Sequence, residues 1–157
     1  MVNKQKADFV RAQITDAIQQ GAEKQIHNKL FEMDAGYTAY LAPQVLLNVN
    51  HGMRIMQEES FGPVVGIMSV GSDEQAVELM NDSEYGLTAS IWTSDESAAF
   101  TLGQHLETGT VFMNRCDYLD PALAWTGVKH SGLGCTLSEV GYEQLTRPKS
   151  FHLKTSS

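Results

Sequence analysis

The sequence has few cysteines and a shortage of positive charge. Only two of its 157 residues are cysteine, Cys116 and Cys135, which is too few for a disulfide framework and fits reduced thiols in a cytosolic protein. Lysine and arginine number 11 against 19 aspartate and glutamate residues, which gives a formal net charge of −8. This acidic balance argues against a general nucleic-acid binder and against a protein that binds anionic membranes.

Long apolar runs are also missing. No run approaches the length needed to span a bilayer, and the opening "MVNKQKADFV" lacks the apolar region of a secretory signal. No repeat, low-complexity tract or Pro/Ser-rich linker marks a second domain. The hydrophobic fraction of 42% and the charged fraction of 19% are ordinary for a soluble globular chain. We therefore expect a cytoplasmic protein with no nucleic-acid or membrane partner.

The first part of the sequence predicts an amphipathic helix followed by a strand. Apolar residues recur at helical spacing within residues 6–23, and Gly21 is a natural C-terminal stop. The expected apolar stripe comprises Phe9, Val10, Ile14, Ala17 and Ile18. Residues 40–49 then read as a strand, in which Pro43 suits a strand start or a sheet edge.

From residue 63 onward, short apolar segments alternate with helix-forming segments. The predicted strands cover residues 63–70, 87–93 and 110–114, and the predicted helices cover residues 72–82 and 93–107. This order predicts parallel strands in one sheet, joined by right-handed crossovers. The strands that precede helices read as apolar on both faces, as expected for a sheet covered by helices on both sides.

Both of these helices begin with the spacing of a capping box. Ser72 and Gln75 have this spacing in the first helix, and Thr93 and Glu96 have it in the second. Gly109 is expected to end the second helix.

After Asn114 the character of the sequence changes. Residues 115–139 form a long glycine-containing stretch with Tyr118 and Trp125, and a loop of this length is usually functional. A short helix is predicted over residues 138–145. Residues 149–154 alternate in polarity like a terminal strand.

The residues alone leave several readings of the polar side chains open. Glu58 and Glu59 read most simply as solvated loop acids, because adjacent residues on an extended chain point in opposite directions and do not easily share one substrate atom. A metal site there would have only His51 as a further ligand, and the five histidines show no metal-ligand spacing. Trp125 is equally consistent with a core residue and with an aromatic wall for an apolar substrate.

Neither thiol reads as an activated nucleophile. Cys116 is followed by Asp117, and an adjacent acid raises the pKa of a thiol and opposes its activation. Cys135 lies in "SGLGC", which is a weak dinucleotide fingerprint and more simply a turn. A structural role is therefore favoured for both cysteines. An independent enzyme that uses Cys116 as its nucleophile is the less favoured alternative.

Taken together, the motifs resemble the C-terminal part of the catalytic domain in the NAD(P)-dependent aldehyde dehydrogenase family. The resemblance is carried by five blocks in the family's order: "EESFGPV" (58–64), "YGLTASIWTSD" (85–95), "TGTVFMN" (108–114), "WTGVKHSGLG" (125–134) and "YEQLTRPKSFHLK" (142–154). It implies an oxidoreductase that converts an aldehyde to a carboxylic acid with NAD or NADP as cofactor.

The resemblance also implies roles for individual residues. The acid two positions before the Phe of the Phe-Gly-Pro motif hydrogen-bonds the nicotinamide ribose in the family, and here it is Glu59. Phe61 corresponds to the aromatic residue that packs against the nicotinamide end of the cofactor. Trp125 stands where the family often has Phe, and it is the candidate substrate-facing aromatic.

The implied architecture is an α/β fold, a three-layer, mostly parallel sheet with helices on both faces, present here in incomplete form. Residues 1–146 would form part of the catalytic domain. Residues 147–157 would form a C-terminal strand and tail that extends the sheet of a neighbouring subunit, which predicts a homo-oligomer.

The resemblance finally implies what this chain does not supply. The family's catalytic cysteine, its general-base glutamate and its dinucleotide-binding half precede the matching region, so we expect no catalytic residue in this chain and no activity by the chain alone. Binding of NAD or NADP by this segment alone should be weak or absent. Two alternatives of another class are a self-associating module derived from the family and a module that pairs with an N-terminal half.

Overall fold

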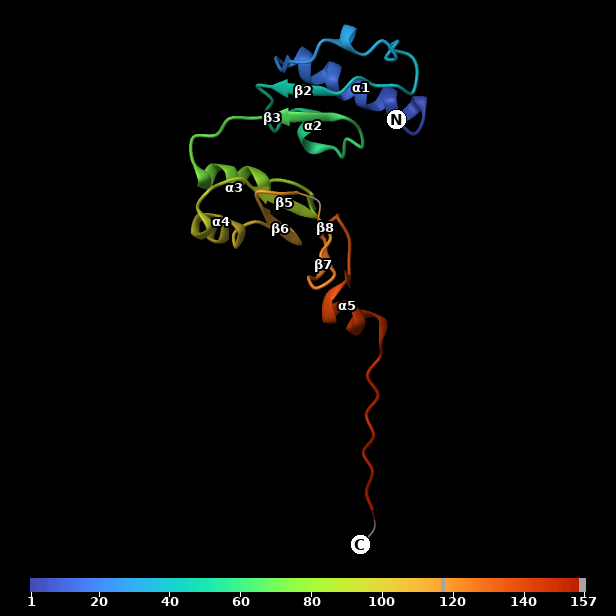
Figure 1. The fold of residues 1–157 in the computed structure, drawn as a ribbon, viewed down its shortest axis with the longest axis vertical. Coiled ribbons are helices and arrows are strands. Elements are labelled where there is room, and N and C mark those ends of the chain that lie inside the picture. Colours follow the sequence, from blue (N-terminus) through green and yellow to red (C-terminus); the bar gives the residue numbers. More distant parts are fainter. Residues whose placement is uncertain (117, 156–157) are drawn as a thin grey trace. The chain divides into compact units, whose positions relative to one another are not determined.

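The structure is a computed structural model that describes residues 1–116 and 118–155. It divides into two compact units, Met1–Ser72 and Asp73–Ser157 (Figure 1). The sequence carries no linker-like composition at this division. Each unit has its own helices and its own strand pairs.

The first unit contains a three-stranded sheet in the order β1–β2–β3. β1 pairs antiparallel with β2, and β2 pairs parallel with β3. The elements are α1 (Lys4–Gln19), β1 (Glu23–Lys24), the 3-10 helix η1 (Asn28–Leu30), β2 (Gln44–Leu47), α2 (Arg54–Gln57) and β3 (Val64–Ile67). The predicted strand start at Pro43 is confirmed, because β2 begins at the next residue.

Helix α1 confirms the predicted helix and corrects its buried face. Asn3 caps its N-terminus by accepting a hydrogen bond from the Lys6 N–H, and Gly21 follows its end with a positive φ of 105°. Phe9 and Ile18, which we expected in the apolar stripe, are each 41% exposed. The buried residues are Ala7, Val10, Gln13, Ile14 and Ala17. The stripe is thus narrower than the apolar spacing suggests and includes one polar residue.

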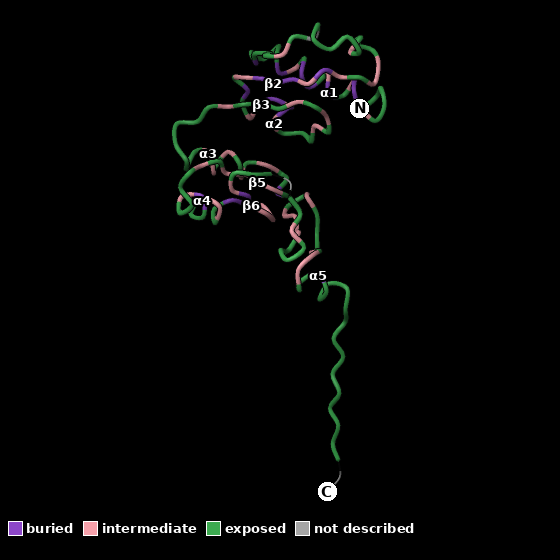
Figure 2. Tube along the Cα trace, viewed as in Figure 1, coloured by how far each residue is buried: buried purple, intermediate pink, exposed green. Residues whose placement is uncertain are grey.

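The core of the first unit joins α1, β2 and α2, and Figure 2 shows its buried residues in purple. Leu46 on β2 and Met53 just before α2 have no exposed surface. On the opposite face of the sheet, Val65 is 52% exposed and Ile67 is 47% exposed. The prediction that this strand is buried on both faces is therefore wrong within the first unit, because the helices of this unit pack against one face only.

In the part that the structure describes, the second unit contains three two-stranded pairs. β5 and β6 are parallel, whereas β4 with β8 and β7 with β9 are antiparallel. The elements are α3 (Asp73–Asn81), β4 (Tyr85–Gly86), β5 (Thr88–Ile91), α4 (Glu96–Gly103), β6 (Thr110–Met113), β7 (Trp125–Thr126), β8 (Val128–Lys129), β9 (Cys135–Thr136) and α5 (Ser138–Leu145).

The second half of the predicted strand–helix order is confirmed as β5–α4–β6, a parallel pair joined by a helix. In the first half, β3 pairs with β2 rather than with β5, so the three predicted strands do not share one sheet among the described residues. The α/β character of the fold is confirmed. Both parallel pairs are short, as expected for an incomplete domain.

Helix α4 begins and ends at different residues from those predicted. Its N-cap is Asp95, whose side chain accepts a hydrogen bond from the Ala98 N–H at 3.0 Å. The Thr93 hydroxyl instead accepts from the Asp95 N–H. The helix ends at Gly103 rather than near Gly109, because tighter turns follow in which the Leu106 N–H bonds to the Gly103 carbonyl.

The C-terminal segment is exposed. All of residues 147–155 are exposed, and no helix or strand is assigned to them; Figure 1 shows an extended chain here. Phe151 is 74% exposed and Leu153 is 83% exposed. The predicted terminal strand therefore finds no partner strand within the described part of this chain.

Candidate functional site

The first candidate site residues lie on the segment between α2 and β3. Glu59 is exposed, and no hydrogen bond or ion pair engages its carboxylate among the described residues. Phe61 is 80% exposed, which is unusual for a phenylalanine. The segment thus presents a free carboxylate and a free aromatic ring two positions apart.

The neighbouring acid, Glu58, is exposed, as the sequence predicts for a solvated acid, but its carboxylate is not free. Its carboxylate accepts two hydrogen bonds from Arg54, at 2.8 and 2.9 Å, and one from the Gln13 amide at 3.0 Å. The bond from Arg54, opposed by partial burial and aided by Gln13, lowers the pKa of Glu58. The two adjacent acids therefore have separate environments, one anchored and one free.

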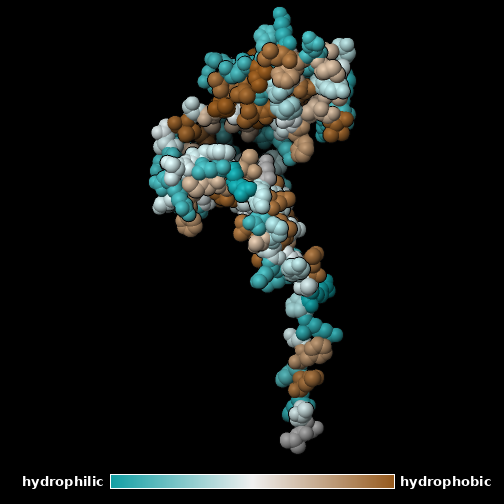
Figure 3. Space-filling model, viewed as in Figure 1, coloured by the Kyte–Doolittle hydropathy of each residue, from teal (hydrophilic) through white to brown (hydrophobic). Residues whose placement is uncertain are grey.

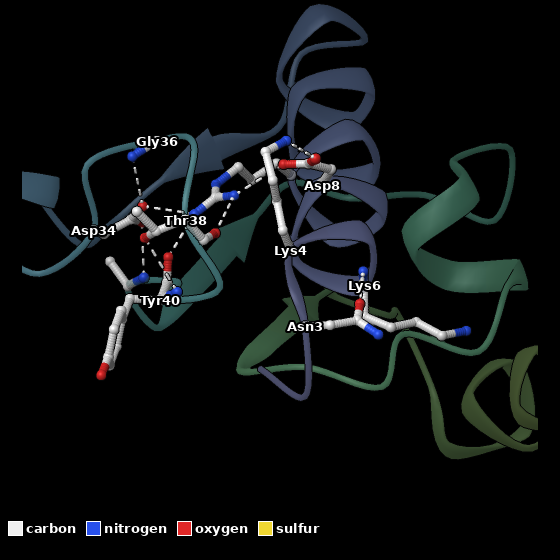
Figure 4. A network of polar contacts seen from close by, with 10 residues as sticks. Asn3, Lys4, Lys6, Asp8, Asp34, Gly36, Thr38 and Tyr40 are labelled. Atoms are coloured by element: carbon white, nitrogen blue, oxygen red, sulfur yellow. Dashed lines mark hydrogen bonds and ion pairs between the residues drawn. The ribbon is translucent and has the colours of Figure 1, made fainter.

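A second polar network holds residues 34–42 against α1 (Figure 4). The Arg11 guanidinium donates to the Asp34 carboxylate at 2.9 Å and to the carbonyl oxygens of Thr38 and Tyr40. Asp34 also accepts hydrogen bonds from two backbone N–H groups, those of Gly36 and Ala42. This network fixes the chain that leads into β2, and it belongs to the scaffold of the first unit.

Trp125, the candidate substrate-facing aromatic, lies on β7 in the second unit. It is partly buried and pairs with Thr136 of β9. The Thr126 hydroxyl donates to the Gly134 carbonyl at 2.8 Å and closes the same hairpin. Partial burial fits both interpretations that the sequence left open, a core residue and a wall of a substrate pocket.

Close backbone contacts hold this hairpin in place. A Cβ added at Gly109 would lie 1.7 Å from the Thr126 carbonyl oxygen, so only glycine fits there. Lys129 forms an ion pair with Glu107 at 2.6 Å and donates to the Asn81 carbonyl at 2.7 Å. The close approach at Gly109 and the bonds of Lys129 thus hold the backbone of the hairpin.

The stretch between β6 and β7 is tethered at both ends. Strand β6 ends at Met113, one residue before the predicted end, and Asn114 follows it. The Asn114 side-chain amide accepts from the Thr93 N–H at 3.0 Å and donates to the Thr93 carbonyl at 2.7 Å. The Arg115 guanidinium lies 3.8 Å from the centre of the Tyr118 ring. At the other end, the Ser138 N–H donates to the Pro121 carbonyl at 2.9 Å. The predicted loop of residues 115–139 is thus not without secondary structure, because β7, β8 and β9 lie within it.

The two cysteines differ in exposure. Cys135 is partly buried in β9, which fits the structural role predicted for it. Cys116 is exposed, so a packing role does not describe it. The acid that follows it, Asp117, lies outside the described residues.

The described residues also bear on two other kinds of site. No group of three or more His, Cys, Asp or Glu side chains is arranged to hold a metal ion in residues 1–116 and 118–155. Within the same residues, no helix is long and apolar enough to cross a membrane.

Sequence reasoning missed Gln13 as a functional candidate. Its partners, Glu58 and Ser60, lie 45 and 47 residues further along the chain, so no local spacing reveals them. The available signal was a polar residue within the narrow apolar stripe of an amphipathic helix.

Comparisons with known proteins agree with the resemblance. The model of the aldehyde dehydrogenase family matches residues 1–151. The chain is 40% identical over 137 residues to the succinate semialdehyde dehydrogenase (NAD(P)+) of Escherichia coli, covering 87% of this chain and 29% of that protein. It is 35% identical over 124 residues to the betaine aldehyde dehydrogenase of Bacillus subtilis, covering 79% of this chain and 25% of that protein.

Solved structures show the same relationship. An indole-3-acetaldehyde dehydrogenase in complex with NAD+ superimposes with a TM-score of 0.88 at 33% identity, covering 99% of this chain and 31% of that one. An NADP-dependent glyceraldehyde-3-phosphate dehydrogenase from Bacillus halodurans, complexed with NADP, gives a TM-score of 0.78 at 38% identity, covering 86% and 27%. The chain thus spans less than a third of the length of these relatives. On the match over nearly its whole length, the chain belongs to the aldehyde dehydrogenase family.

Proposed function

We propose that this chain supplies the nicotinamide-ribose contact, the substrate loop and an oligomer contact of an NAD(P)-dependent aldehyde dehydrogenase, and that it does not oxidise aldehydes by itself. The observation that carries the proposal is the free Glu59 carboxylate and the 80% exposed Phe61 ring on one anchored segment. In the proposed role, Glu59 accepts hydrogen bonds from the two ribose hydroxyls and Phe61 packs beside the nicotinamide.

The residues present suit this cofactor. A carboxylate has two oxygens and accepts from both hydroxyls of a ribose diol, and charged acceptors form stronger hydrogen bonds than neutral ones. An exposed aromatic ring offers an apolar face to a flat heterocycle. When bound, the nicotinamide accepts the hydride that leaves the aldehyde-derived carbon. In this proposal Glu59 and Phe61 orient the cofactor, and Trp125 borders the aldehyde.

Titration with nicotinamide mononucleotide tests the ribose contact, because this probe contains the nicotinamide and the ribose diol without the adenosine half. We expect weak binding by the 157-residue chain, with shifts in the NMR signals of Glu59 and Phe61. Glu59→Gln should weaken it about tenfold, since a charged acceptor is replaced by a neutral amide. Glu32→Gln, at another exposed acid of the first unit, is the matched control. Equal affinity of the wild type and the Glu59→Gln variant would remove Glu59 from the site.

A second candidate function is a non-catalytic module that self-associates or binds a partner. It is favoured by the open apolar sheet face at Val65 and Ile67 and by the exposed Phe151 and Leu153 of the tail. Strand addition by residues 147–155 would give a homo-oligomer. Light scattering after size exclusion tests it, and a monomer at all concentrations with no captured partner would count against this function.

A further inference from the structure

Gln13 is a fully buried glutamine whose side-chain amide is hydrogen-bonded at both its nitrogen and its oxygen. It lies in the buried stripe of α1, and its exposed fraction is 0%. A buried amide is costly unless its hydrogen-bonding groups are satisfied, and here both ends are used. Gln13 Nε2 donates to Glu58 Oε2 at 3.0 Å, and Gln13 Oε1 accepts from the Ser60 hydroxyl at 2.9 Å.

The chemistry of the partners fixes the orientation of this amide. The ionised Glu58 carboxylate only accepts hydrogen bonds, so the amide nitrogen faces it. The amide oxygen then faces the Ser60 hydroxyl, which donates. One side chain therefore holds the two residues that flank Glu59.

Three further contacts limit the movement of the same segment. Arg54 holds Glu58 through two parallel N–H···O bonds, a geometry that adds directional restraint. The Glu58 N–H also donates to the Arg54 carbonyl at 2.9 Å, and the Gly62 N–H donates to the Ser60 carbonyl at 2.7 Å. Residues 58 and 60 are anchored through both side chain and backbone, while the side chain of Glu59 between them is free.

We propose that Gln13 is a positioning residue for the ribose-binding segment, in which it clasps Glu58 and Ser60 so that Glu59 and Phe61 are held ready for the cofactor. This inference rests on the function proposed above for Glu59. Its physical basis is preorganisation: a segment that is already ordered loses less conformational entropy on binding. Gln13 does not touch the cofactor in this account and acts through the backbone of residues 58–60.

The test uses Gln13→Met, which keeps the length of the side chain and removes both hydrogen bonds. We expect the amide hydrogen exchange of Glu58 and Gly62, whose N–H groups are hydrogen-bonded in this segment, to rise about tenfold, because the segment loses both of its bonds to the Gln13 side chain. The affinity for nicotinamide mononucleotide should fall by a similar factor, while exchange within α1 stays protected. Gln5→Met, at an exposed position of the same helix, is the matched control and should change neither quantity.

Ser60→Ala removes only the hydrogen bond between the Ser60 hydroxyl and Gln13, at a less buried position, and it replaces Gln13→Met if that variant fails to fold. It should raise the exchange and lower the affinity by less than Gln13→Met does. Unchanged exchange of the Glu58 and Gly62 amides in the folded variants would overturn the clasp. If Glu59→Gln weakens binding but Gln13→Met and Ser60→Ala do not, the positioning role fails and the proposed function stands. If Glu59→Gln has no effect on binding, the proposed function fails, and the exchange measurement still decides whether the clasp orders the segment.

Discussion

The two units of the chain hold their candidate site residues by different means. The first unit packs large side chains such as Leu46 and Met53 into one continuous core and anchors the Glu59 segment to it through Gln13. Among the described residues of the second unit, the buried apolar side chains are Ala89, Ala99, Leu106 and Phe112. Its hairpin is held by close backbone approach and by bonds from side chains to backbone. The segment that carries Glu59 is thus supported by a packed core, whereas the hairpin that carries Trp125 is supported by backbone geometry.

The largest expected effect tests the core of the first unit. Leu46→Ala removes a side chain with no exposed surface and should lower the free energy of unfolding by about 2–5 kcal/mol. Leu47→Ala, on the partly exposed face of the same strand, is the matched control and should cost less. Native-state hydrogen exchange of the α1 and β2 amides measures both. Equal losses of unfolding free energy in the two variants would show that both faces of β2 are buried alike. That result would contradict the view that the first unit is built on a core on one side of its sheet.

The next effect tests the backbone geometry of the second unit. Gly109→Ala should destabilise this unit by about 1–3 kcal/mol, because the new Cβ would overlap the Thr126 carbonyl oxygen. Gly103→Ala is the control, since its Cβ would meet only the Val111 side chain at 3.3 Å. Tryptophan fluorescence during urea unfolding is a suitable measurement, because both tryptophans lie in the second unit. A Gly109→Ala variant as stable as the wild type would contradict the close approach.

The smallest expected effect is the pH dependence of the first unit. Burial by itself raises the pKa of Asp34, but hydrogen bonds from the Ala42 N–H, from Arg11 and from the Gly36 N–H outweigh it, so the pKa lies below the ordinary value of 3.8. A lowered folded-state pKa stabilises the fold above the ordinary value, and this stabilisation is lost as the pH falls through the folded value. Unfolding followed between neutral pH and pH of about 2 should show this loss, and Asp34→Asn should reduce it. A larger acid loss in Asp34→Asn would contradict the assignment.

Local sequence signals predicted the elements whose ends are marked by a glycine, a proline or a similar boundary residue. Gly21 and Pro43 mark the end of α1 and the start of β2, and α5 has the predicted bounds of residues 138–145. The end of α4 was missed because the turns after Gly103 bury Leu106, and that depends on packing rather than on a breaker residue.

The candidate site was predictable only in part. Glu59, Phe61 and Trp125 were identified by motif order, and their roles remain predictions. The anchoring of Glu58 was not predictable, because its partner Gln13 is distant in sequence. The exposure of Val65 and Ile67 was missed for a related reason. Apolar composition indicates that a strand is buried, but it does not show which helix or strand covers each of its faces.

The central claim is that this chain carries cofactor and substrate contacts but not the chemistry. An assay of the purified 157-residue chain with NAD+ or NADP+ and an aldehyde, such as succinate semialdehyde or betaine aldehyde, tests it most directly. The account predicts no formation of reduced nicotinamide above the background. Robust turnover that is abolished by Cys116→Ala or by Cys135→Ala would contradict it.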